Sequence, residues 1–106
     1  MNISILDAAS QDIMDGFWFY KSQEAGLGDY FLDSLFSDID SLTIYAGIHQ
    51  IYFGKYHRLL SKRFPFAIYY RIKDNTVLVY AVLDCRRNPA WIRKKLSNIG
   101  LKGANE

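Results

Sequence analysis

Residues 55–91 decide the fold, and they read KYHRLLSKRFPFAIYYRIKDNTVLVYAVLDCRRNPAW. Three short apolar runs stand here between basic and turn-forming residues, which predicts an antiparallel meander of three strands, Tyr56–Ser61, Phe66–Ile72 and Thr76–Asp84. The short connection Lys73-Asp74-Asn75 is typical of a hairpin. Pro65 has no N–H to give to a strand ladder, so it is expected just before the second strand.

Working outward toward the N-terminus, the sequence takes on the periodicity of helices. Asn2–Leu6 alternates and is rich enough in β-branched residues to predict a short first strand. Asp7 offers an N-cap carboxylate for a helix that enters at Ala8. Apolar residues then recur at helical spacing as far as Gly26 and Gly28, where this helix is expected to end.

A second helix is expected from near Asp29. Its apolar residues recur at helical spacing as far as Ala46, and Gly47 suits the left-handed position that follows a helix. A loop over residues 48–54 then leads into the sheet. We expect the two helices to pair as a hairpin that covers one side of the sheet.

After the sheet, Asn88-Pro89 is typical of an N-cap followed by proline in the first helical position. A short basic helix is expected over Pro89–Asn98, and residues 100–106 are expected to be a frayed, flexible tail. The sequence thus predicts one α+β domain over residues 1–99. It comprises an N-terminal strand, a two-helix hairpin, a three-stranded antiparallel meander and a short C-terminal helix.

Charge is distributed very unevenly along the 106 residues. Residues 1–54 hold eight acids and one base, whereas residues 55–106 hold twelve bases and three acids, and the net charge is only +2. This split predicts an acidic helical face and a basic sheet face, and the basic half would attract phosphates or an acidic protein segment. The alternative is that the two halves only balance each other within the molecule.

Several function classes find no support in the sequence. His49, His57 and Cys85 are not at metal-ligand spacing, and no phosphate-binding glycine loop is present, so neither a metal nor a cofactor is expected. With a single cysteine, no signal peptide and no apolar run near the roughly 18 residues of a membrane span, we expect a cytoplasmic protein that does not enter the membrane. Cys85 beside Arg86 is either a thiol of lowered pKa or, in the favoured interpretation, a packed residue at a strand end.

Basic residues mark the ends of the three predicted strands. Because the end of the third strand of a meander lies beside the start of the second, we expect these cations to converge on one surface. Arginine binds phosphates and carboxylates through two parallel hydrogen bonds, and nearby tyrosines would supply aromatic faces. A solvated sheet edge kept from pairing by its charges is the alternative. The cluster comprises Arg58, Lys62, Arg63, Arg71, Arg86 and Arg87.

Short motifs follow one another in order along almost the whole chain, roughly from Ile3 to Leu96. They are Ala9 with Asp12-Ile13 and Tyr20, then Arg58, Phe64-Pro65-Phe66, Ile68-Tyr69-Tyr70-Arg71-Ile72, Val77 to Val82, and Arg86-Arg87-Asn88-Pro89. In their order and spacing the sequence resembles the RelE/ParE superfamily of type II toxin–antitoxin toxins. The resemblance implies a small growth-inhibiting toxin that a cognate antitoxin neutralises by wrapping its C-terminal segment over it, in a hetero-oligomer.

The resemblance implies one of two targets. The RelE branch cuts messenger RNA in the ribosomal A site, whereas the ParE-like, plasmid-stabilisation branch poisons DNA gyrase. Cleavage needs a base, an acid and cations to stabilise a charged phosphorane. Arg58 matches the first basic position of the RelE pattern, but Leu60, Ala67 and Cys85 stand where three further cations belong, and Trp91 replaces a tyrosine.

These replacements favour a ParE-like inhibitor of gyrase over a RelE-like ribosome-dependent nuclease, and a degenerate toxin kept only for antitoxin binding is a third reading. If the protein is a nuclease, the implied catalytic residues are His57, Arg58, Arg86 and Arg87, with His57 and Arg86 as an acid/base pair. The residues expected to bind the target or the antitoxin are Arg58, Lys62, Arg63, Arg71, Arg86, Arg87 and Trp91.

Overall fold

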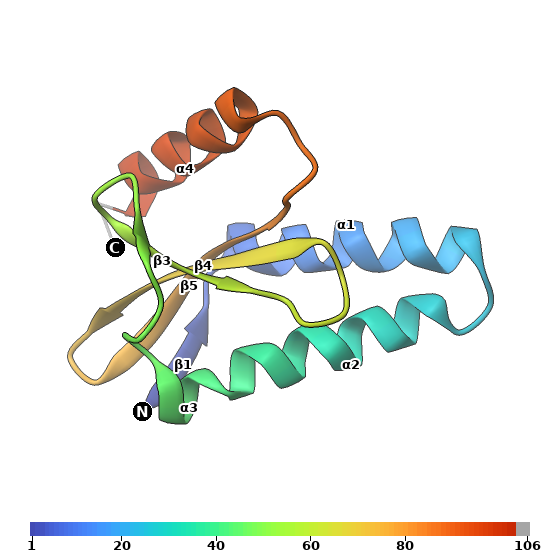
Figure 1. Cartoon of the computed structure of the whole chain (residues 1–106), viewed down its shortest axis with the longest axis horizontal. Helices are drawn as coiled ribbons and strands as arrows, with labels where there is room; N and C mark the ends of the chain where they lie inside the picture. Colours follow the sequence, from blue (N-terminus) through green and yellow to red (C-terminus); the bar gives the residue numbers. More distant parts are fainter. Residues whose placement is uncertain (104–106) are drawn as a thin grey trace.

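The protein folds as an α+β domain, as the sequence predicted. The computed structural model describes the backbone of residues 1–103 and the side chains of residues 1–99. In chain order the elements are β1 (Asn2–Ile5), α1 (Asp7–Gln23), α2 (Leu27–Asp40), α3 (Leu42–Tyr45), β2 (Ile51–Tyr52), β3 (Tyr56–Leu60), β4 (Phe66–Lys73), β5 (Thr76–Asp84) and α4 (Pro89–Gly103). Figure 1 shows α4 on one side of the sheet and the α1–α2 hairpin on the other.

The sheet has five strands in the order β1-β5-β4-β3-β2. The predicted meander is confirmed, because β3, β4 and β5 pair antiparallel in sequence order, and β5 has the predicted bounds. β1 pairs parallel to β5, with Ile3 opposite Val77. The predicted loop over residues 48–54 contains a fifth strand that the sequence did not reveal: β2 pairs with the start of β3, with Tyr52 opposite Tyr56.

The hairpin between β4 and β5 turns on two residues. Asp74 and Asn75 both have positive φ, 50° and 59°. Two consecutive left-handed residues define the type I′ turn, whose twist matches that of antiparallel strands, and aspartate and asparagine tolerate it better than most residues. The prediction of a hairpin here is confirmed.

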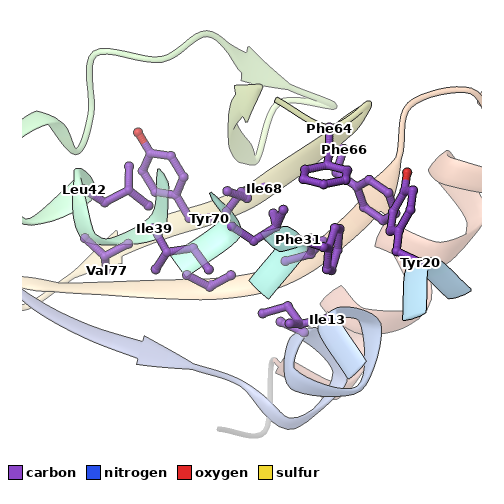
Figure 2. Close-up of a cluster of buried hydrophobic side chains, with 14 residues drawn as sticks. Ile13, Tyr20, Phe31, Ile39, Leu42, Phe64, Phe66, Ile68, Tyr70 and Val77 are labelled. Carbon is purple, nitrogen blue, oxygen red and sulfur yellow. The ribbon is translucent and has the colours of Figure 1, made fainter. Parts of the chain in front are cut away.

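The central strands β4 and β5 are buried on both faces over most of their length. On one face, Phe66, Ile68 and Tyr70 of β4 pack under α1 and α2 in a first core, which also contains Phe31 and Ile39 of α2 (Figure 2). On the other face, α4 covers a second core, which comprises Tyr56, Ala67, Tyr69, Tyr80, Ala81, Leu83, Ile92 and Leu96.

A β-bulge in β5 determines which of its side chains point into each core. Tyr69 is opposite Ala81 but Tyr70 is opposite Val79, so Tyr80 is the extra residue of β5. One extra residue reverses which face each later side chain meets. Val79 therefore points into the first core, Tyr80 and Ala81 both point into the second, and Val82 returns to the first.

Helix boundaries differ from the predictions at several points. α1 begins at Asp7 rather than Ala8 and Leu6 is its N-cap residue, so Asp7 lies in the first turn instead of capping it. Gly26, at φ +82°, precedes α2, and Gly28 lies inside that helix rather than ending α1. The expected second helix is interrupted at Ser41, whose hydroxyl donates to the carbonyl of Asp38.

The C-terminal helix begins as predicted. The side-chain oxygen of Asn88 accepts a hydrogen bond of 2.7 Å from the backbone N–H of Ala90, and Pro89 is the first helical residue. α4 continues to Gly103, beyond the predicted end at Asn98. Part of the predicted flexible tail is therefore helical, and residues 104–106 lie outside the described part of the chain.

Gly16 allows α1 and α2 to approach closely. A Cβ at this position would lie 2.5 Å from Cζ of Phe31. The Phe31 ring is fully buried and has the rings of Tyr20, Phe64 and Phe66 at centroid distances of 5.0–5.2 Å. Since it is enclosed on these sides, it cannot move aside for an added methyl group.

We predict that Gly16→Ala destabilises the domain by about 1–3 kcal/mol, because overpacking at Phe31 outweighs the roughly 1 kcal/mol that alanine adds to helix propensity. Chemical denaturation of both proteins measures this. The double variant Gly16→Ala/Phe31→Leu should recover part of what the two single changes lose together. Strictly additive losses would show that the two residues do not compete for space.

Candidate functional site: a divided basic surface and a charged cleft

Arg58 lies on the face of the sheet that α4 covers. Its guanidinium carbon lies 3.9 Å from the centroid of the Tyr52 ring, and it donates a 2.6 Å hydrogen bond to the Tyr52 hydroxyl. Directly opposite on β4 is Tyr69. Burial raises the pKa of Tyr69, and the nearby positive charge of Arg58 opposes that rise. Arg58 therefore presents a positive charge beside two aromatic hydroxyls, a suitable arrangement for an anionic group.

His57 faces the other way, as neighbours on a strand must. Its ring stacks on Tyr70 at 5.0 Å, and its Nδ1 contacts the carbonyl of His49 at 2.8 Å. The Tyr70 hydroxyl also accepts the N–H of Gly47 and contacts Nδ1 of His49. This polar cluster joins the segment before β2 to the sheet, and burial lowers the pKa of His49.

The structure does not bring His57 and Arg86 together. His57 is opposite Tyr70 on β4, whereas Asp84, two residues before Arg86, is opposite Phe66. Four strand residues span about 13 Å, so the two side chains start well apart along the strands. An acid/base pair of these two residues has no geometric support.

The cations after β5 have separate partners. Arg86 binds the Asp84 carboxylate through Nε and Nη2 at 3.0 and 2.7 Å. This pairing lowers the pKa of Asp84 and raises that of Arg86, which already lies far above neutrality. Arg87 stacks over Trp91, with its guanidinium carbon 4.0 Å from the ring centroid.

The remaining cations lie elsewhere. Arg71 is two residues beyond Tyr69 on β4, so it shares the face of Arg58, and its side chain is exposed. Lys62 and Arg63 lie in the β3–β4 connection near α2. There the backbone N–H of Lys62 donates to the buried Asp38 carboxylate, and Arg63 lies 5.9 Å from the Tyr30 ring.

The expected convergence on a single surface is therefore wrong: the cations form three groups. Arg58 and Arg71 lie on the α4 face, Lys62 and Arg63 at the β3–β4 connection, and Arg86 and Arg87 after β5. The cause is burial, because the centres of β4 and β5 are covered on both faces and exclude charge. Among the described side chains the only ion pair is Arg86–Asp84, so none of the three groups is neutralised by the acidic helices.

The residues around Arg58 supply little acid/base chemistry. Leu60 is half exposed, Ala67 is fully buried, and burial raises the pKa of Cys85, whereas the nearby charge of Arg58 opposes the rise. A general base works best with a pKa near the operating pH, and both Tyr69 and Cys85 are shifted away from it. Cys85 follows the end of β5 and is exposed, so the favoured prediction of a packed residue is wrong. Its raised pKa also does not agree with a thiol of lowered pKa.

Asp12 is a polar contact that the sequence analysis missed. Its carboxylate accepts a 3.0 Å hydrogen bond from the backbone N–H of Val82, which is buried. β1 ends at Ile5, opposite Val79, so beyond this point β5 has no strand neighbour on that side. Asp12 therefore takes the place of a strand and accepts the hydrogen bond of the backbone N–H there. Burial raises the pKa of Asp12 to about 6, although the hydrogen bond and Lys95 act against the rise. The sequence held one indication of this contact: Asp12 is an acidic residue directly beside Ile13, which belongs to the apolar stripe of α1.

Asp12 lies in a cleft of about 300 Å³ between α1, the end of β5 and α4. Helix α1 contributes Asp12, Asp15 and Phe19 to the walls. Trp91 and Lys95 contribute from α4, and Arg87 from the segment before it. The cleft thus has an acidic wall and a basic wall with an aromatic ring on each.

Two other kinds of site find no support in the described part of the chain. Its side chains contain no group of three or more histidine, cysteine, aspartate or glutamate residues that could hold a metal ion. None of its helices combines the length and the apolar character needed to cross a membrane.

Comparison with known proteins supports the fold. Neither protein-family models nor curated protein sequences match the chain. Among solved structures, a chain described as "Chromosomal ParDE TA system from P. aeruginosa" superposes with a TM-score of 0.66 at 16% sequence identity, covering 77% of this chain and 92% of the other. The fold expected from the RelE/ParE resemblance is therefore confirmed, since the similarity extends over most of both chains.

We predict that Asp12 makes the free energy of unfolding fall as the pH rises from about 4 to about 6. Its pKa is near 6 in the folded protein and 3.8 otherwise, so in this window the folded state binds more protons than the unfolded state. Asp12→Asn keeps an acceptor for Val82 but cannot ionise. The substitution should therefore remove this pH dependence of the free energy of unfolding between about pH 4 and 6. It should also stabilise the protein at pH 7.5 by roughly 1–2 kcal/mol, allowing for solvent screening.

Denaturation curves at several pH values measure the effect. Asp29→Asn is the matched control, since Asp29 is exposed on α2 and does not line the cleft of Asp12. A pH dependence in Asp12→Asn that equals that of the parent protein would assign the titration to another group.

Proposed function

We propose that the protein is the toxin component of a type II toxin–antitoxin module, that a cognate antitoxin neutralises it, and that its target in the cytoplasm is DNA gyrase. Two observations support the toxin assignment: the order of motifs that resembles the RelE/ParE superfamily, and a fold similar to that of a chain from a ParDE system. The proposed complex with the antitoxin would be a hetero-oligomer. The basic half of the chain would serve partner binding, with Arg58, Lys62, Arg63, Arg71, Arg86, Arg87 and Trp91 as the proposed contacts.

One observation carries the choice of the ParE-like branch. On the α4 face, the side chains around Arg58 are Tyr52, Tyr69 and Cys85, and burial raises the pKa of both Tyr69 and Cys85. Stabilising a phosphorane and moving a proton would need more than one guanidinium together with a base that titrates near neutrality. A toxin that acts by binding its target needs only an exposed basic surface and no catalytic base.

A RelE-like ribosome-dependent nuclease is the second candidate, and one feature favours it. Arg58 occupies the first basic position of the RelE pattern and projects beside Tyr52 and Tyr69. In this alternative Arg58 would bind the scissile phosphate with help from Arg86 and Arg87, and His57 would take no direct part because it faces the other side of the sheet.

Induced expression of the protein separates these functions. DNA supercoiling, gyrase–DNA breaks and the integrity of translated messages are followed in the same culture. The proposal predicts accumulated gyrase–DNA breaks with intact messages. Rapid cleavage of messages at codon boundaries would replace it with the nuclease alternative, and the absence of any growth defect would indicate a degenerate toxin.

We predict that Arg86→Ala and Arg87→Ala each weaken growth inhibition and leave the fold intact. Exposed ion pairs and cation–aromatic contacts contribute little to stability, so melting temperatures should change by no more than a few degrees. Lys94→Ala is the matched control on an exposed face of α4. If lost toxicity is always accompanied by an equal loss of thermal stability, the two arginines are structural.

A further inference from the structure

We propose that the cleft between α1 and α4 is a peptide-binding site for a short segment in which an apolar side chain stands between an acidic and a basic one. The proposal rests on the proposed function in one respect, because the antitoxin would supply this segment. The site is distinct from the surface around Arg58, which lies on the open part of the α4 face near β2.

The two walls of the cleft carry opposite charges that do not meet. Asp12 and Asp15 stand on α1, and Lys95 and Arg87 stand across from them. Among the described residues, none of these four forms an ion pair within 4.0 Å. Opposite charges held apart across a cleft favour a ligand that is itself bipolar, since such a ligand completes both walls at once.

The carboxylate of Asp12 is positioned to accept a further hydrogen bond. Only one of its oxygens is used in the described part of the chain, in the bond from the Val82 N–H. Asp12 is held in place by that bond, and a fixed acceptor in a partly buried site binds a donor at a lower cost in entropy than a mobile one. A lysine or arginine of the ligand would meet Asp12 and Asp15, and an acidic residue would meet Lys95.

Between the walls the cleft is apolar. Phe19 and Trp91 stand on its two sides, and Val82 and Leu83 form part of its lining. Arg87 and Lys95 approach the Trp91 ring at 4.0 and 5.9 Å, so the ring is held beside the positive charges that would receive the acid. A volume of about 300 Å³ suits two or three side chains rather than a large ligand.

Charge complementarity selects the occupant. A nucleic acid would bring its phosphates against Asp12, Asp15 and Asp84, which all line the cleft. A ligand of one charge sign would meet repulsion from one wall. A peptide segment can carry both signs and an apolar group at the spacing of successive residues, so it is the class that fits.

Three capped tripeptides test the site directly: acetyl-Glu-Leu-Lys-amide, and the single-sign controls acetyl-Glu-Leu-Glu-amide and acetyl-Lys-Leu-Lys-amide. Each is titrated into the labelled full-length chain, and amide shifts are followed by NMR. The proposal predicts shifts at Gly16, Val82 and the Trp91 indole, with a Kd of about 1 mM for the bipolar peptide and at least fivefold weaker binding of both controls.

Matched variants locate the effect. Lys95→Glu should remove the preference for the bipolar peptide, whereas Lys94→Glu, the exposed neighbour on α4, should leave it unchanged. Asp15→Lys with Asp29→Lys as its control gives a second pair on the opposite wall, should Lys95→Glu fold poorly. Equal affinities for all three peptides, or identical effects within each variant pair, would overturn the proposal.

The same NMR experiment detects other ligands of the cleft. Shifts at the cleft that depend on protein concentration alone would indicate a second copy of this chain, and shifts there with single-stranded oligothymidylate would indicate nucleic acid. Either result overturns the proposal. Peptide binding without any growth inhibition would support the peptide site and contradict the proposed function. Growth inhibition without peptide binding would support the proposed function and contradict the peptide site.

Discussion

The structure depends on burial of the central strands on both faces. β4 and β5 lie between the first core under α1 and α2 and the second core under α4, and residues 66–70 of β4 are all buried. A strand covered on both sides must be apolar at successive positions, which explains the near-continuous apolar runs. A β-bulge in β5 changes which face its side chains meet, so that Tyr80 and Ala81 both point into the second core. The sheet is thus a shared wall between two cores.

The same constraint determines where the sheet can carry charge. Charge is excluded from the middle of the sheet, so the described cations of the sheet and its connections lie on β3, at the exposed end of β4, and in the segments before and after the central pair. The one carboxylate that approaches the centre, Asp12, does so because β5 extends beyond the end of β1 and needs an acceptor there. The divided basic surface and the charged cleft are therefore consequences of the packing.

Local signals in the sequence were enough for the elements whose cause is local. The Asp74-Asn75 turn, the Asn88 cap with Pro89, and the bounds of β5 follow from backbone preferences within a few residues. The strand β2 was missed because its two residues form a strand only by pairing with β3. The interruption at Ser41 was also missed, although the hydrogen bond from its hydroxyl to the backbone carbonyl of Asp38 is local.

The candidate site was predictable in composition but not in arrangement. Sequence position indicated which residues are basic, but the expected convergence assumed that strand ends alone fix where side chains point. Alternation sends His57 to one face and Arg58 to the other, and Asp84 holds Arg86 at the end of β5. Asp12 stands 70 residues from its partner Val82, so only the folded chain reveals their contact.

Native-state hydrogen exchange tests the two-sided burial of the central strands most directly. The account predicts that the amides of residues 67–70 and 77–82 exchange only through global unfolding, with protection free energies equal to the total stability, and that Leu96→Ala lowers all of them together. If these amides exchange through a local opening while α1 and α2 stay protected, α4 does not close a second core, and the account is contradicted.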